Sequence, residues 1–131
     1  MSAQGLARGL TLDTGALLAL ERGETRVRAL LRRALEIGID LAVPAGVVAQ
    51  AWRGGPRQAR IARLLGDPVV LVAALDDATA RAVGLLCGRS GQADVVDARV
   101  ALHAREHGHT VVTSDPDDLR LIDPGLRLVV V

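Results

Sequence analysis

Short apolar runs alternate along this chain with longer stretches in which apolar positions recur every three or four residues. A short apolar run bounded by turn residues is typical of a buried strand. The runs predict strands over residues 10–12, 40–43, 69–72, 110–113 and 126–131. The periodic stretches predict helices over residues 16–20, 24–37, 45–52, 57–65, 76–87, 94–107 and 115–121. The stretch Gly88-Arg89-Ser90-Gly91 is expected to form a loop.

The segment 24–37 has the clearest helical pattern. One face carries Val27, Leu30, Leu31, Ala34 and Leu35, and arginine and glutamate side chains occupy the opposite face. This spacing is typical of a surface helix that packs one apolar stripe against a core. Gly38 is expected to end this helix, because glycine readily adopts the left-handed conformation found at helix C-termini.

The alternation of strands and helices predicts the fold class. Nearly continuous apolar strands separated by helices are typical of a parallel sheet that is covered on both faces. We therefore expect an α/β protein, a three-layer α/β/α sandwich with a central parallel sheet of five strands. Residues 1–9 are expected to be a loose N-terminus, and residues 10–131 a single domain.

Composition narrows the class of protein further. Half of the residues are hydrophobic, which excludes a disordered chain. The longest apolar run, Val69 to Leu75, has 7 residues and is too short to span a membrane. Asp13 interrupts any signal-peptide core, so we expect a cytoplasmic protein. Cys87 is the single cysteine, which excludes an internal disulfide, and it is expected to be a small buried hydrophobic residue. The net charge of +1 favours no particular partner.

Four aspartates lie at the ends of predicted strands or the starts of helices. Asp13 follows the first strand, Asp115 follows the fourth, and Asp94 and Asp97 share the first turn of a long helix. Ligands of parallel α/β sheets bind beyond the carboxyl ends of the strands, so we expect Asp13, Asp97 and Asp115 to converge there, close enough to share one ion. Carboxylate oxygens suit Mg²⁺ or Mn²⁺, which can activate a water for phosphodiester cleavage.

Each of these acids also has a purely structural interpretation. Asp13 and Asp94 could cap the helices that they precede, since aspartate is a preferred N-cap residue. Asp115 could cap the short helix that follows it, with Asp118 acting as the acid of a capping box.

Four segments stand out in order along the chain: Leu12-Asp13-Thr14, the stretch 43–52, Asp94-Val95-Val96-Asp97-Ala98 and Thr113-Ser114-Asp115. Together they resemble the ordered motifs of PIN-domain ribonucleases, in particular the VapC-type toxins of toxin–antitoxin pairs. The resemblance implies a PIN-like fold and a Mg²⁺- or Mn²⁺-dependent endoribonuclease that is dimeric and is inhibited by a cognate antitoxin. Asp13, Asp97 and Asp115 match the family's acids, and Asp94 is a further acid at the same helix start.

One position departs from the family pattern. The second acid of the family, normally a glutamate on the helix after the second strand, falls on Gln50. An amide oxygen can face a metal or its water but carries no charge, and Asp94 could supply the missing carboxylate. The alternative is a catalytically silent PIN-like module that binds RNA or protein.

Residues 52–63 contain the candidate RNA-binding side chains. Trp52 could stack on an unpaired base with Arg53 on a phosphate, although packing between two helices is the favoured interpretation for Trp52. Arg57, Arg60 and Arg63 form either a solvated helix face or part of a track for RNA.

One further motif is set aside. His103-Ala104-Arg105-Glu106-His107 matches a zinc-peptidase pattern, but no glutamate follows Glu106, and His109 lies just beyond the helix end, so the further ligand of such a site is missing.

Overall fold

A computed structural model describes residues 8–131, so most of the predicted loose N-terminus, residues 1–7, lies outside the described residues. The chain forms one five-stranded sheet in the order β3-β2-β1-β4-β5, and all neighbouring strands are parallel. The strands are β1 (Gly9–Leu12), β2 (Asp40–Pro44), β3 (Val70–Ala73), β4 (Thr110–Thr113) and β5 (Leu128–Val130).

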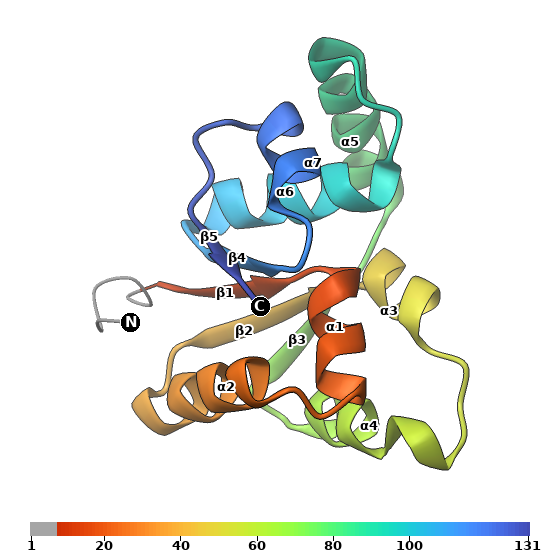
Figure 1. Ribbon diagram of the computed structural model, residues 1–131. Coiled ribbons are helices and arrows are strands. Elements are labelled where there is room, and N and C mark those ends of the chain that lie inside the picture. Colours follow the sequence, from red (N-terminus) through yellow and green to blue (C-terminus); the bar gives the residue numbers. More distant parts are fainter. Residues whose placement is uncertain (1–7) are drawn as a thin grey trace.

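Helices connect the strands and cover both faces of the sheet (Figure 1). Their bounds are α1 (Thr14–Glu21), α2 (Thr25–Ile37), α3 (Ala45–Ala51), the 3₁₀ turn η2 (Pro56–Gln58), α4 (Ala59–Gly66), α5 (Asp77–Ser90), α6 (Val95–His107) and α7 (Pro116–Ile122). Helices α1, α2 and α4 lie on one face, whereas α6 lies on the other with α5 and α7 beside it (Figure 1). The predicted α/β/α sandwich with a parallel five-stranded sheet is confirmed.

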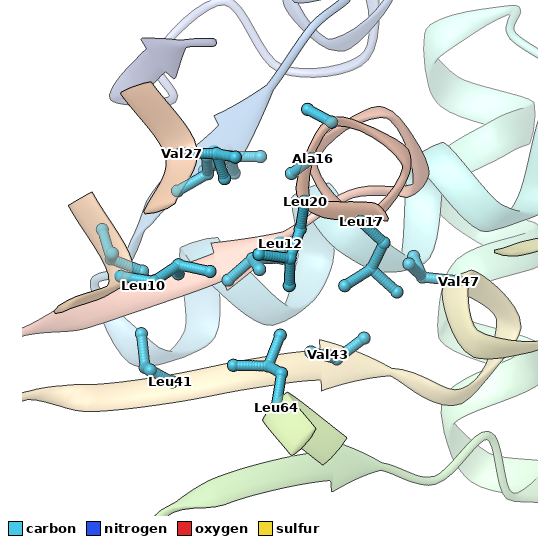
Figure 2. Packing of buried hydrophobic residues seen from close by; sticks show 14 of the residues in the cluster. Leu10, Leu12, Ala16, Leu17, Leu20, Val27, Leu41, Val43, Val47 and Leu64 are labelled. Carbon is cyan, nitrogen blue, oxygen red and sulfur yellow. The ribbon is translucent and has the colours of Figure 1, made fainter. Parts of the chain in front are cut away.

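The main core lies between the sheet and the helices α1, α2 and α4. Leu10 and Leu12 of β1 point to this face, and Figure 2 shows them among Leu17 of α1, Val27 of α2 and Leu41 of β2. All five side chains are essentially buried. Full burial of such a side chain stabilises the folded state by about 1.5–3 kcal/mol, so this layer anchors β1 at the centre of the sheet.

Two helical segments differ from the expectation. The loop predicted over 88–91 is wrong, because α5 continues to Ser90 and Gly91 ends it in the left-handed conformation at φ 72°. Gly88 remains helical, since packing of α5 against α6 and α7 outweighs the low helix propensity of one glycine. The helix predicted over 57–65 is divided into η2 and α4.

A second, smaller apolar cluster lies between α5, α6 and α7. Cys87 is partly buried rather than buried, and it packs against this cluster, which is formed by Val83, Ala98, Ala101 and Ile122. Within residues 8–131, no helix has the length and apolar character needed to cross a membrane.

Candidate active site

The strand order creates a crevice at the carboxyl end of the central strand. From β1 the chain crosses to β2 on one side of β1, and later elements add β4 on the other side. Such a switch point opens a space between neighbouring loops in parallel sheets. Asp13 follows β1 and Asp115 follows β4, so both acids lie at this point. The start of α1 closely approaches β4 here, because a Cβ placed on Gly15 would collide with Ser114 Oγ.

Asp13 is held rigidly and is only 5% exposed. Its Oδ1 accepts a hydrogen bond of 2.8 Å from the Ala16 amide, which confirms the predicted cap of α1. The Thr113 hydroxyl also donates to this carboxylate. Burial raises the pKa of Asp13, the hydrogen bonds from Thr113 and Ala16 lower it, and the charge of Asp115 raises it. A carboxylate has about four lone-pair positions, so capping α1 leaves Asp13 able to bind a ligand.

Asp97 lies on the first turn of α6, next to the cap of that helix. Asp94 provides the cap, as predicted, and its Oδ1 accepts hydrogen bonds of 3.0 Å from the amides of both Val96 and Asp97. Burial raises the pKa of Asp97 to about 6, together with the charges of Asp94, Asp13, Asp118 and Asp115. Asp97 is therefore within electrostatic reach of all the acids at this edge of the sheet.

The capping-box prediction for Asp115 is wrong. Its side chain forms no cap of α7, and its backbone amide donates to Thr113 Oγ1 at 2.8 Å instead. A hydrogen bond between the side chains of Asp115 and Asp118, together with the charge of Asp118, raises the pKa of Asp115. Asp118 is thus a further acid of the cluster, which sequence reasoning treated only as a capping residue.

Gln50 lies beside the acids, at the last turn of α3. Its Oε1 accepts a hydrogen bond of 2.5 Å from Thr14 Oγ1, and Thr14 directly follows Asp13. The amide Nε2 of Gln50 is left as a donor in an exposed position.

Sequence reasoning missed two supporting hydroxyl groups. Thr14 orients Gln50, and Thr113, which is fully buried, connects Asp13 with the backbone of Asp115. Both threonines stand inside motifs that carried the family resemblance, Leu12-Asp13-Thr14 and Thr113-Ser114-Asp115, so their position next to an acid was the available signal.

The donor set suits a hard divalent cation. Several carboxylates raise one another's pKa values, and a cation between them would relieve that repulsion. In the part of the chain that the structure describes, however, no group of three or more His, Cys, Asp or Glu side chains is arranged so that it could hold a metal ion. The expectation that Asp13, Asp97 and Asp115 are already close enough to share one ion is therefore not confirmed.

The candidate RNA-binding residues divide into two places. Trp52 caps α3 and is 40% exposed, so the favoured prediction that it packs between two helices is wrong. Arg53 donates to the carbonyl oxygens of Ala49 and Trp52, at 3.0 and 2.7 Å.

Arg57 and Arg60 line a groove of about 640 Å³ together with Arg22, Arg28 and Arg63. Arg60 donates to the carbonyl oxygen of Glu21, the last residue of α1. Asp13 precedes the first residue of this helix, so the two positions lie about 12 Å apart along the helix axis. The structure thus separates this basic groove from the acids.

Solved structures with the same fold share low sequence identity with this chain. The structure of FitAB bound to an IR36 DNA fragment matches with a TM-score of 0.62 and 18% identity, over 92% of this chain and 93% of that chain. The crystal structure of FitAcB from Neisseria gonorrhoeae matches with a TM-score of 0.59 and 21% identity, over 91% and 95%. The crystal structure of PAE2754 from Pyrobaculum aerophilum matches with a TM-score of 0.62 and 19% identity, over 95% and 92%.

No curated protein matches the sequence. The sequence model of the PIN domain matches residues 10–123, a range that runs from β1 past the end of α7 and contains every acid described above. This range is most of the chain, and the protein therefore belongs to the PIN domain family.

Proposed function

We propose that this protein is a metal-dependent endoribonuclease that cleaves phosphodiester bonds in cellular RNA. PIN domains are generally nucleases. The observation that carries the proposal is the acid cluster at the switch point of the sheet, where the charges of Asp94, Asp13, Asp118 and Asp115 act with burial to raise the pKa of Asp97 to about 6. Such mutual repulsion costs stability, and a site that binds a cation and a phosphodiester explains why the acids are kept together.

Asp13, Asp97, Asp115 and Asp94 would hold Mg²⁺ or Mn²⁺ in this proposal. The ion, when bound, supplies an activated water and neutralises charge on the phosphodiester. Asp13 is positioned by Thr113 and by the start of α1, so its orientation is fixed before any ligand binds. Thr14 orients Gln50 through the hydrogen bond to Oε1, and in this proposal the remaining donor, Nε2, would bind a phosphate oxygen.

The proposal extends to a toxin of a type II toxin–antitoxin system, acting in the cytoplasm as a homodimer with a cognate antitoxin as its partner. The similarity to FitAB, which was solved bound to DNA, and the resemblance to VapC-type toxins support this assignment. Trp52, Arg53, Arg57 and Arg60 are the proposed RNA contacts.

Cleavage of a defined RNA by purified protein tests the proposal. We expect cut products with Mg²⁺ or Mn²⁺, none with a chelator, and at least about 100-fold slower cleavage by Asp97→Asn. The exposed variant Glu106→Gln, at the other end of α6, is the matched control and should cleave like the natural protein.

A catalytically silent binding module is the second candidate, favoured by the uncharged Gln50 among the acids. Binding of the same RNA without any cut product, under conditions in which the protein is folded and metal is present, would support this second candidate and contradict the first.

A further inference from the structure

Three histidines gather at the opposite edge of the sheet from the acids. His103 and His107 stand four residues apart on α6, and Gly108 turns the chain so that His109 returns beside them. The ring centroids of His103 and His107 lie 4.0 Å apart, and His109 lies 5.6 and 5.5 Å from these two rings. These are all the histidines of the chain.

The burial of the two ring nitrogens of His103 is not explained by the packing of the fold. It is only 2% exposed, and neither ring nitrogen has a hydrogen-bond partner within residues 8–131. A buried nitrogen left without a partner costs about 1–3 kcal/mol of stability. The mechanism proposed for the acid cluster does not involve this residue, so its burial calls for a separate explanation.

In each of the other two rings, Nδ1 is hydrogen-bonded and Nε2 has no hydrogen bond to a residue of the range 8–131. His107 Nδ1 lies 2.9 Å from the carbonyl oxygen of His103. A carbonyl oxygen only accepts, so Nδ1 carries the proton and the lone pair of His107 is on Nε2. His109 Nδ1 lies 3.0 Å from Thr11 Oγ1. Metal-binding histidines are typically fixed in this way, through the ring nitrogen that does not bind the metal.

A small cavity adjoins the three rings. It has a volume of about 210 Å³ and is also lined by Asp40, Leu41 and Leu71. The negative charge of Asp40 is within electrostatic reach of His109, and the positive charge of Arg99 lies near His103 and helps to keep its ring neutral. Burial lowers the pKa values of His103 and His109, which favours neutral rings near pH 7.

We propose that His103, His107 and His109 form a binding site for a divalent transition-metal ion of the zinc class, separate from the acid cluster. Imidazole nitrogens suit Zn²⁺, Co²⁺ and Ni²⁺, whereas Mg²⁺ prefers oxygen ligands. An ion here would give one ring nitrogen of His103 a partner and tie the end of α6 to the start of β4. We do not infer a peptidase, because no glutamate follows Glu106 in the sequence to complete the pattern of such enzymes.

Binding requires one rearrangement. As they stand, the rings of His103 and His107 are stacked at an interplanar angle of 19°, and these three side chains, like all others in residues 8–131, are not arranged as a complete ligand set. His107 is exposed, so its ring can turn away from the stack without disturbing the core, although turning gives up the hydrogen bond from its Nδ1 to the His103 carbonyl oxygen. Because this rotation has a cost, we expect micromolar rather than nanomolar affinity.

Titration of the tag-free protein with Co²⁺ tests the proposal, since nitrogen-ligated Co²⁺ has characteristic visible absorption. The Cys87→Ser variant is used throughout, so that the only thiol cannot contribute. We expect one bound Co²⁺, binding weakened at least roughly 10-fold by His107→Gln, and no change on adding Asp97→Asn. Zn²⁺ should displace the Co²⁺ and shift the histidine ring resonances in NMR spectra.

His107→Gln is the informative variant because the side chain is exposed, and the thermal unfolding midpoint without metal checks that the fold is intact. Absence of Co²⁺ binding at millimolar concentration overturns the proposal. So does binding that His107→Gln leaves unchanged, or binding that Asp97→Asn abolishes, which would assign the ion to the acid cluster.

Discussion

At the scale of single residues, Asp97 links the candidate site to the stability of the fold. Its pKa is about 6 in the folded protein, against an ordinary value of 3.8. The folded state therefore binds more protons than the unfolded state between these pH values, and stability falls as pH rises from about 4 to 6. Above pH 6 the charged Asp97 opposes folding, and below about pH 4 this cost is absent.

Asp97→Asn is expected to stabilise the metal-free protein at pH 7. The expected gain is roughly 1–2 kcal/mol, after the pKa shift is discounted for solvent screening at this half-buried position. The gain should disappear toward pH 4, and urea unfolding in a chelator across this pH range measures it. A variant that is less stable than the natural protein at pH 7 would show that Asp97 has a structural role instead.

Gln50 and Asp94 are expected to be coupled through the bound ion. Gln50→Glu adds a charge at nearly constant volume and keeps an acceptor for the Thr14 hydroxyl, so Mn²⁺ should bind more tightly. Asp94→Asn should weaken Mn²⁺ binding, because asparagine still caps α6 but carries no charge. The loss should be smaller in the Gln50→Glu background, since the two carboxylates would compensate.

A double-mutant cycle on Mn²⁺ affinity and on RNA cleavage measures this coupling. Strictly additive effects would mean that Asp94 does not replace the missing acid, which would favour the silent binding module unless the natural protein cuts RNA.

Thr113 is expected to be the positioning residue of the cluster. Thr113→Val keeps the shape but removes the donor to Asp13 and the acceptor for the Asp115 amide. We expect a loss of about 1–3 kcal/mol in unfolding free energy, because the buried Asp13 carboxylate and the partly buried Asp115 amide each lose a partner. Thr113→Ser, which retains the hydroxyl, should restore RNA cleavage more fully than it restores stability. Equal cleavage by the valine and serine variants would exclude a positioning role.

At the scale of elements, two glycines at the end of α5 should respond in opposite directions. Gly88 lies inside the helix and a Cβ there meets no atom within 4 Å, so Gly88→Ala should stabilise the protein by about 0.5–1 kcal/mol. Gly91 has a φ of 72°, so Gly91→Ala should destabilise it by about 1 kcal/mol. Thermal or urea unfolding compares the two directly, and a stabilising Gly91→Ala would place the helix end elsewhere.

At the scale of the whole molecule, binding of an ion at the acid cluster should stabilise the entire fold. The ion binds only the folded state, so at ten times its dissociation constant Mn²⁺ should add about 1.4 kcal/mol to the unfolding free energy. Asp97→Asn should abolish this gain, whereas His107→Gln should leave it unchanged. A rise in unfolding temperature that persists in Asp97→Asn would show that Mn²⁺ binds elsewhere.

The sequence by itself determined the elements and the places of the acids along them. Strand and helix periodicity predicted the α/β/α sandwich, and the caps formed by Asp13 and Asp94 were predicted correctly. These features depend on hydrogen bonds and side-chain patterns within a few neighbouring residues, so a short window of sequence contains the necessary information.

Only the tertiary structure decided how these elements are combined. The strand order joins Asp13 to Asp115, packing leaves Trp52 exposed, and the fold brings Gln50 to Thr14 across 36 positions of sequence. The raised pKa of Asp97 and the contact of His109 with Thr11 also arise from elements far apart in the chain. Desolvation and charge interactions depend on distances in space, and the packing of whole helices on the sheet sets those distances.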